Sequence, residues 1–340
     1  MTGTSFRGRP QIWQAAVGIA VSIVLLWWTL HDVDFVEVWR TIRGARPGPV
    51  LLGVSLATLP FVLRIFRWKL LLRREDGSSL PSIPLWHAIA IGFMANNTLP
   101  LRMGELIRAL AANRLTRARL PAVLASLAVE RLMDVLAVVL LLGIGLLLAG
   151  LPPGTTIAGI RLAPLLATFA MIALAGLAAA ALVVAFPRVA EALLRRVVPW
   201  PRLAERLAGL VEGVTQGMAA LQSPTKITAV VGWSLVIWLC NAASFYAMFG
   251  AFGLQVDFAG ALVLQGAIMF VIAVPSSPGY FGAFEVPVVA VLALFLVPKS
   301  EAVSYAFTYH VTTFVPITLL GLWSVARTGF GLRAVRAATT

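Results

Sequence analysis

The arginine and acidic residues of this chain occur in short groups at helical spacing, inside otherwise apolar sequence. Residues three or four positions apart lie on one face of a helix, so each group would present its charges together. Arginine binds phosphate or carboxylate through a planar fork of donors, and nearby carboxylates could hold unliganded arginines or carry protons. The pattern therefore predicts a site for a phosphate-bearing group. The residues concerned are Arg64 and Arg67, then Arg102, Glu105 and Arg108, then Glu130, Arg131 and Asp134.

A second interpretation is open for some of these residues. Arg64, Arg67 and Lys69 are near the predicted inner end of an apolar stretch, where long basic side chains extend to the membrane surface and mark the cytoplasmic side. For Glu130 and Asp134, a structural ion pair with a neighbouring arginine is the alternative to direct contact with a ligand or a proton.

Two further segments interrupt apolar sequence with polar and helix-breaking residues. Hydrocarbon offers no water to satisfy broken backbone hydrogen bonds, so such backbone lies inside protein or against a water-filled cavity. A carboxylate at that depth is costly and usually functional. We therefore predict that both segments are tips of re-entrant hairpins and line the site. The polar tip residues are Asn96 and Asn97 in the first, and Ser276, Ser277, Gly279, Gly282 and Glu285 in the second.

Composition indicates a membrane protein. Of 340 residues, 60% are hydrophobic and 12% charged, and the mean hydropathy is +0.91; soluble domains average roughly 25% charged residues. The net charge of +13 is better explained by basic cytoplasmic loops and anionic headgroups than by nucleic acid. The single cysteine, Cys240, excludes a disulfide framework. The three histidines have no metal-ligand spacing, so neither a metal nor a cofactor is expected.

Hydropathy predicts six full transmembrane helices. A span needs about 20 apolar residues, whereas each arm of the two interrupted segments has about a dozen or slightly more and would reach only the midplane. The fold class predicted is thus an all-α integral membrane protein with about six full transmembrane helices and two re-entrant helical hairpins. The six stretches are about 12–30, 49–68, 121–149, 159–186, 227–250 and 303–325.

The distribution of basic residues orients these spans. With both termini in the cytoplasm, 21 Lys and Arg residues fall in cytoplasmic segments and five in external loops. This is a strong positive-inside bias, and it would weaken if the first hairpin crossed the membrane fully, because Arg102 to Arg119 would then be external. The N- and C-termini are predicted to be cytoplasmic.

The order of these elements predicts an inverted repeat within a single membrane domain, residues 1–340. Each half reads span, amphipathic connection, span, hairpin, span. Three crossings per half is an odd number, so the second half, 159–325, would be inverted relative to the first, 12–149, and the hairpins would enter from opposite faces. Many secondary transporters have this architecture, with the site where the tips meet.

Four motifs resemble a known family. They are Phe-Arg-Trp-x-x-Leu-Leu at 66–72, Arg-x-Gly-Glu-x-x-Arg at 102–108, Glu-Arg-x-x-Asp at 130–134 and Pro-x-x-Pro-Gly-x-x-Gly-x-x-Glu at 275–285. Their order over almost the whole chain resembles the lysylphosphatidylglycerol synthase transmembrane, or flippase-like, family. The resemblance implies a polytopic helical bundle; the best-known members move an aminoacylated phospholipid between leaflets. Full-length synthases also carry a soluble domain, which we expect this chain to lack, and Tyr280 stands where a second glycine is expected.

The sequence thus favours a lipid translocase, a flippase or scramblase rather than an enzyme. The expected partner is a membrane lipid with an anionic or aminoacylated headgroup in a bacterial-type cytoplasmic membrane. Proton or ion coupling and homo-oligomer formation are both open. One alternative is a membrane-embedded transferase acting on a lipid headgroup or lipid-linked sugar, with Glu105, Glu130 or Glu285 as general base. Another is an accessory subunit of a lipid or glycan pathway that transports nothing itself.

Overall fold

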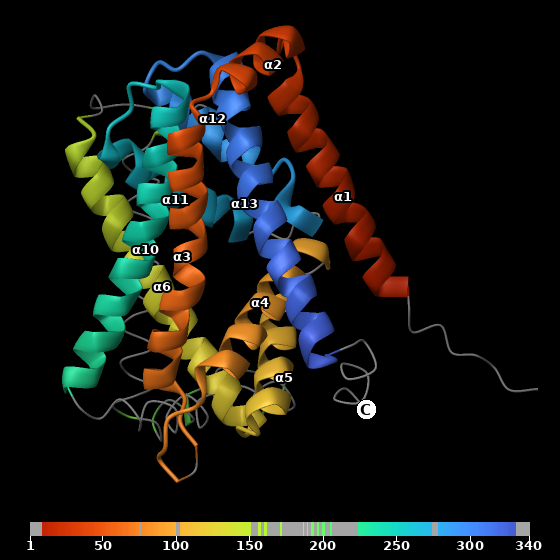
Figure 1. The fold of residues 1–340 in the computed structure, drawn as a ribbon, viewed down its shortest axis with the longest axis vertical. Coiled ribbons are helices and arrows are strands. Elements are labelled where there is room, and N and C mark those ends of the chain that lie inside the picture. The colour runs from red at the N-terminus through yellow and green to blue at the C-terminus, as the bar shows by residue number, and fades with distance from the viewer. Residues whose placement is uncertain are drawn as a thin grey trace, which may run out of the picture.

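The computed structural model describes residues 9–74, 76–99, 103–150, 224–273 and 278–330, together with short pieces of the segment between them, 151–223. The described part is almost entirely helical (Figure 1). Two two-residue strands, β1 (Thr156–Ile157) and β2 (Ile160–Arg161), pair antiparallel. The helices are α1 (Arg9–Leu30), α2 (Phe35–Gly44), α3 (Pro47–Leu71), α4 (Ser82–Thr98), α5 (Gly104–Thr116), α6 (Leu120–Leu148), α10 (Pro224–Phe252), α11 (Phe258–Ala273), the 3-10 turn η2 (Pro278–Tyr280), α12 (Glu285–Leu294) and α13 (Lys299–Thr328).

Local sequence explains where several helices begin and end. The Asp34 carboxylate caps α2 by accepting from the backbone N–H of Val36 at 2.8 Å, as short polar side chains do at helix starts. Proline lies in the first turn of α3 and of α6, where its missing N–H costs nothing. Helix α13 ends at Gly329, which adopts a left-handed conformation with φ of 61°, the usual helix stop.

Four of the described helices are long and apolar enough to cross a membrane: α3, α6, α10 and α13. They contain the predicted spans 49–68, 227–250 and 303–325 and, but for its last residue, 121–149. The predicted span 12–30 lies within α1, which is 22 residues long. The predicted span 159–186 falls almost entirely outside the described residues, and its proposed start is wrong because Ile160 and Arg161 form β2.

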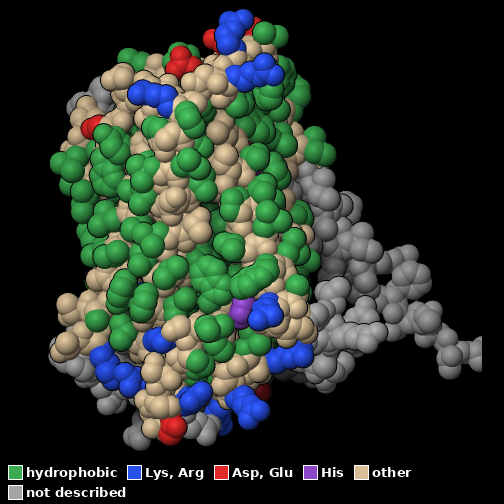
Figure 2. All heavy atoms as spheres, viewed as in Figure 1, with side chains coloured by type: hydrophobic (Ala, Val, Ile, Leu, Met, Phe, Trp, Pro, Cys, Tyr) green, Lys and Arg blue, Asp and Glu red, His purple; other side chains and the backbone are tan. Residues whose placement is uncertain are grey.

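The surface has the distribution expected of a protein with lipid on its flanks. Figure 2 shows hydrophobic side chains along the whole visible side of the molecule. Lys and Arg gather at its lower end, whereas basic and acidic side chains are mixed at the upper end. The chain is therefore an integral membrane protein with its basic side chains concentrated at one end.

The two interrupted segments form short helical hairpins. In the first, α4 and α5 have 17 and 13 residues; in the second, α11 and α12 have 16 and 10. At 1.5 Å per residue all four are shorter than the roughly 30 Å of bilayer hydrocarbon. In Figure 1, α4 and α5 occupy the lower half and α11 and α12 the upper half. The inner end of the second hairpin, η2, contacts α4.

Each hairpin has its own apolar core. One core surrounds Trp68, Leu85 and Ile89, where α3 and the first hairpin pack together with α6. The other surrounds Phe249, Leu264 and Tyr305, where α10 and α13 enclose the second hairpin. The spanning helices thus hold the two hairpins end to end, with their inner ends facing each other.

A close approach of backbone fixes the first hairpin. A Cβ on Gly104 would collide with the carbonyl oxygen of Gly92 and with the side chain of Asn96. The same Gly104 donates its backbone N–H to Asn96 Oδ1 at 2.9 Å. A glycine is therefore required at the start of α5, because only hydrogen fits between the two arms.

Replacing this glycine should loosen the hairpin. Gly104→Ala is expected to destabilise the protein by about 1–3 kcal/mol, the usual cost of overpacking. Gly143→Ala is the control, because a Cβ there meets nothing within 4 Å and alanine is the better helix former. Unfolding in mixed SDS micelles, followed by circular dichroism, measures both variants. Equal stability of the two would contradict the close approach.

Accessibility of single cysteines tests the orientation. In a chain carrying Cys240→Ala, Arg114→Cys lies near the end of α5 at the basic end, and Lys299→Cys starts α13 at the other. An impermeant thiol reagent should label position 299 in intact cells and position 114 only after permeabilisation. Labelling of position 114 from outside would show that the first hairpin crosses the membrane.

Candidate functional site

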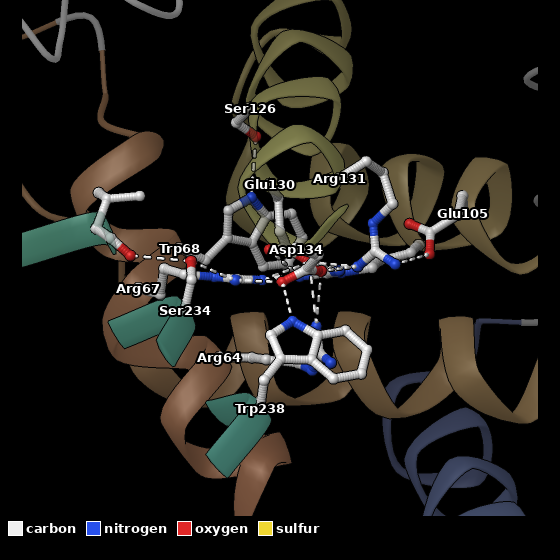
Figure 3. Close-up of polar contacts among 12 residues, drawn as sticks. Arg64, Arg67, Trp68, Glu105, Ser126, Glu130, Arg131, Asp134, Ser234 and Trp238 are labelled. Atoms are coloured by element: carbon white, nitrogen blue, oxygen red, sulfur yellow. Dashed lines mark hydrogen bonds and ion pairs between the residues drawn. The ribbon is translucent and has the colours of Figure 1, made fainter. Parts of the chain in front are cut away.

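Two carboxylates buried near the middle of the protein are the centre of the polar network. Glu130 and Asp134 are on one face of α6 and are 0% and 3% exposed. An isolated buried carboxylate costs several kcal/mol, so such groups are paired with cations or neutralised. Four arginines from three helices surround this pair (Figure 3).

Arg108 on α5 makes the most regular of these pairs. Its two terminal nitrogens donate to the two oxygens of Glu130 at 2.6 and 3.1 Å, the fork geometry that gives arginine its strongest pairs. Its guanidinium also lies 4.0 Å above the ring of Trp68, whose indole N–H donates to Ser126 at 2.9 Å. Both terminal nitrogens of Arg108 are thus engaged, and the residue links the first hairpin to α3 and α6, whereas its buried Nε has no hydrogen-bond partner among the described residues.

Arg67 on α3 is engaged in the same way. Its Nη1 donates to Asp134 Oδ1 at 2.5 Å and to Ser234 Oγ on α10 at 2.9 Å. The residue is 0% exposed. The same oxygen of Asp134 accepts from the indole N–H of Trp238 at 3.0 Å. The network therefore ties α3, α6 and α10 together, and the interpretation of Arg67 as a basic side chain reaching the membrane surface is wrong.

Arg64 has longer contacts with the carboxylates, and Arg131 is more exposed than the other arginines of the network. Arg64 Nη1 is 3.4 Å from Asp134 and 3.6 Å from Glu130, and its guanidinium lies near the rings of Phe93 and Trp238. Arg64 is 7% exposed, so the surface interpretation is wrong for it too. Arg131 Nη2 is 2.8 Å from Glu130 and 3.1 Å from Asp134, yet 40% of its side chain is exposed.

The network carries more positive than negative charge. Among the described residues, four arginines share the two buried carboxylates, and the third carboxylate, Glu105, is 3.6 Å from Arg131 and 37% exposed. Even when Glu105 is counted, one cation is in excess. An anion placed beside Arg64 and Arg131 would therefore be favoured.

These two arginines face a cavity of about 340 Å³ between the inner ends of the hairpins. Its lining is mainly apolar, with a few polar groups, which is typical of a ligand site. Glu105 lies on the wall beside Arg131 (Figure 3), and its Oε2 has no hydrogen-bond partner in the described part of the chain. The polar and aromatic lining residues are Phe61, Arg64, Phe93, Asn96, Asn97, Glu105, Arg131, Trp238, Asn241 and Tyr280.

Glu285 lies apart from this network. Its Oε2 accepts from the backbone N–H of Gly282 at 2.6 Å, and its Oε1 is 2.6 Å from Nδ1 of His310. Glu285 is 0% exposed and does not line the 340 Å³ cavity. Gly279 and Gly282, at φ of 78° and 83°, shape the turn that it holds; a Cβ on Gly282 would be 2.9 Å from the carbonyl oxygen of Ser22.

The structure thus brings most of the predicted residues to two regions, the charged network with its cavity and the turn of the second hairpin. Arg64, Arg67, Glu105, Arg108, Glu130, Arg131 and Asp134 form the network, Asn96 and Asn97 line the cavity, and Gly279, Gly282 and Glu285 form the second hairpin's turn. Arg102, Ser276 and Ser277 lie outside the described residues. No cluster of three or more metal-binding side chains occurs in the described ranges.

Sequence reasoning missed three contributors. Trp238 and Ser234 complete the coordination of Asp134 and Arg67 from α10, and His310 pairs with Glu285. A histidine within an apolar span is itself a signal of function. Its partner, however, is 25 positions away in the chain, so local spacing could not reveal the pair.

Comparison with known proteins identifies the family. The sequence model of the lysylphosphatidylglycerol synthase TM region matches residues 15–321. The chain belongs to this family.

Two known proteins are similar in sequence to this chain. Glycosyltransferase AglD of Haloferax volcanii is 26% identical over 329 residues, which cover 88% of this chain and 52% of AglD. A UPF0104 membrane protein of Methanothermobacter thermautotrophicus is 27% identical over 119 residues, covering 35% of this chain and 36% of that protein. The chain thus spans about half the length, or less, of the curated relatives it matches.

Within this family member, three of the four motifs contribute to one network. Arg67 and Trp68 come from the first motif, Glu105 and Arg108 from the second, and Glu130 with its neighbours from the third. The fourth motif supplies Glu285 and the turn facing α4. The motifs therefore lie on α3, on α6 and in the two hairpins.

Removal of Arg108 should break the network. Arg108→Gln would leave one carboxylate of a buried pair short of its main partner, at a cost of about 3–5 kcal/mol. Arg114→Gln, on the exposed face of the same helix, is the matched control and should change stability by less than about 0.5 kcal/mol. Unfolding in mixed micelles reports both. A loss at position 108 no larger than at 114 would show that the pair does not hold the hairpin.

Proposed function

We propose that this protein is a lipid translocase that moves a phosphate-bearing headgroup between leaflets through the 340 Å³ cavity. The observation that carries the proposal is the excess of cationic charge on the cavity wall, where Arg64 and Arg131 are incompletely satisfied by Asp134 and Glu130. Arginine in such a position suits phosphate, because its planar donors match two phosphate oxygens. The acyl or prenyl tails would stay in the bilayer.

A second feature supports a headgroup that also donates hydrogen bonds. Glu105 and the amides of Asn96 and Asn97 lie on the same wall, and Glu105 Oε2 has no partner among the described residues. A carboxylate accepts hydrogen bonds from ammonium or hydroxyl groups. A phosphate near Arg131 and an amine or hydroxyl near Glu105 would use both. An aminoacylated or zwitterionic phospholipid has this pairing.

The arrangement of the hairpins supplies a route. Both are too short to span the hydrocarbon, and their inner ends meet at the cavity. We infer that they are re-entrant, that they enter from opposite faces, and that residues 12–149 and 159–325 are inverted repeats. Access from either leaflet would then alternate by movement of one hairpin relative to the other. The cytoplasmic side would be the basic end, in a bacterial-type inner membrane with both termini inside.

A membrane-embedded transferase is the second candidate. The observation in its favour is the name of the relative AglD, a glycosyltransferase matched over 88% of this chain. Of the acids in the cavity region, Glu130 is saturated by arginine, so only Glu105 among the described cavity-lining residues has a carboxylate oxygen without a partner. A general base needs such an oxygen, and a transferase would change the headgroup's chemistry rather than its leaflet.

Reconstitution separates these functions. Purified protein in liposomes that contain fluorescent phosphatidylglycerol should expose inner-leaflet label to an impermeant quencher, with headgroups chemically unchanged by mass spectrometry. Arg131→Lys should slow translocation at least about tenfold, since losing a bidentate charge-assisted contact costs about 1.5–3 kcal/mol. Arg74→Lys, exposed outside the cavity, is the control.

The outcomes are distinct. Translocation by the wild type that Arg131→Lys slows at least about tenfold, and Arg74→Lys does not, supports a headgroup site at the cavity. Equal rates in both variants would contradict it. Altered headgroups would instead identify a transferase. Neither transport nor chemistry from the purified protein would indicate an accessory subunit.

A further inference from the structure

His310 and Glu285 form a buried acid–base pair that the phosphate site does not use. Glu285 is 0% and His310 6% exposed, and Nδ1 of the histidine is 2.6 Å from Glu285 Oε1. The rings of Phe281 and Phe284 lie 4.7 Å from the imidazole. When Glu285 is ionised it can only accept, and a neutral His310 then donates to it from Nδ1. Its other nitrogen, Nε2, is left with a free lone pair.

That nitrogen is the polar atom that His310 can offer to a second, smaller cavity. This cavity has about 130 Å³ and is lined by His310 together with Thr313 and Phe314. In the described part of the chain Nε2 has no hydrogen-bond partner. A proton can therefore be added at Nε2 without breaking the bond to Glu285. The product is an imidazolium beside a carboxylate, which is a neutral pair.

The small cavity adjoins the cavity of about 340 Å³, which we call the headgroup cavity. Asn97 and Tyr280, together with Ile272 and Ile317, line both. Asn97 also donates to Thr318 at 2.9 Å. Thr318 lies on α13 about two helical turns beyond His310. A charge gained at His310 is thus separated from a headgroup phosphate by a shared wall of four side chains.

The pair also controls the turn at the inner end of the second hairpin. Glu285 Oε2 accepts from the N–H of Gly282, whose φ of 83° no other residue type readily adopts. The turn continues into Tyr280, which lines the headgroup cavity. When His310 gains a proton, negative charge on Glu285 is drawn toward the imidazolium and the Gly282 hydrogen bond weakens.

Other titratable groups near the pair are few. Tyr309 of α13 lies within 5.8 Å of Phe284, and its hydroxyl is 2.5 Å from that of Ser244; Tyr280 of η2 is the other neighbouring phenol. No acid or base occurs in α11, in residues 20–30 of α1 or, apart from His87 near its opposite end, in α4. The headgroup cavity adds Arg64, Arg131 and Glu105.

We infer that the Glu285–His310 pair is the binding site of a proton that is taken up with the anionic headgroup, an inference that rests on the proposed translocase function. A phosphate in the larger cavity attracts the added positive charge, and by linkage a proton at His310 strengthens phosphate binding equally. Histidine suits this role because its charge changes between about pH 5 and 8. The coupling site is thus formed by Glu285 of the second hairpin and His310 of α13, and the anion site by Arg64 of α3 and Arg131 of α6.

Calorimetry tests proton uptake directly. Dihexanoyl phosphatidylglycerol is titrated into the detergent-solubilised protein in two buffers of different ionisation enthalpy, and the difference in heat counts the protons bound. Wild-type protein should take up a proton below pH 8, and its affinity should rise as pH falls, by up to about tenfold per pH unit for one fully coupled proton. His310→Gln should bind the lipid with no proton uptake and an affinity that varies less than about twofold.

Two further variants test whether proton uptake depends on the Glu285–His310 pair. His87→Gln is the matched control, because His87 is also buried, lies against Trp323 with ring centroids 5.4 Å apart, and has no carboxylate partner in the described residues; it should behave as wild type. Glu285→Gln keeps an acceptor for Gly282 but its amide donates to Nδ1. Neutral His310 would then carry its proton on Nε2, and uptake should be lost as well.

The same variants are then measured in liposomes with an imposed pH gradient. Wild-type translocation should respond to the gradient, whereas His310→Gln should translocate without responding. Unchanged proton uptake in His310→Gln would overturn the inference and leave the translocase intact. Absence of lipid binding in the wild type would overturn the headgroup site itself, and the coupling with it.

Discussion

The desolvation of Glu130 and Asp134 is the constraint on which the rest of the structure depends. Two carboxylates on one face of α6, both essentially buried, would each cost several kcal/mol if unpaired. Their neutralisation requires guanidinium groups from α3 and α5 and donors from α10. The rotation of α3 and the depth of the first hairpin are therefore determined by hydrogen-bond geometry and not by apolar packing alone. Once Arg67 and Arg108 satisfy the carboxylates, Arg64 and Arg131 are left in excess, and they face the cavity.

Charge pairing of this kind needs backbones that approach closely. Gly104 allows the two arms of the first hairpin to touch at Gly92, which brings Arg108 to Glu130 and keeps Asn96 at the break. In the second hairpin, Gly282 packs on the backbone of α1 and is held by Glu285. Small residues at helix contacts are common in membranes, because no hydrophobic force drives helices together there. The two hairpins thus share a device, a glycine held by a polar side chain, although the polar groups around them differ.

Sequence alone identified the helices well because hydropathy and length decide them. The spans corresponding to α3, α6, α10 and α13, and the breaks that give two short hairpins, followed from the approximately 20 residues needed to cross hydrocarbon and from the cost of irregular backbone in lipid. The grouping of charged residues was also visible in their spacing. The different roles of these charges were not visible. Arg64 and Arg67 are the same residue type three positions apart, and only the packing of α3 against α6 and α10 decides that the terminal nitrogens of Arg67 pair with Asp134 and Ser234 while Arg64 faces the cavity. The histidine partner of Glu285 was equally hidden, because pairing across two helices leaves no local pattern.

The separation of charges between the hairpins bears on how a headgroup could cross. A permanently cationic wall alone would bind a phosphate and hold it, since arginine stays charged at any physiological pH. Release needs a second group whose charge can change, and among the described residues His310 is the titratable imidazole next to the headgroup cavity. In the proposed cycle, Arg64, Arg131 and protonated His310 would all favour the anion; once the proton had left toward the other face, only the two arginines would. Movement of the second hairpin's turn, held by the same Glu285, would then be tied to loss of affinity, which is what a coupled translocation cycle requires.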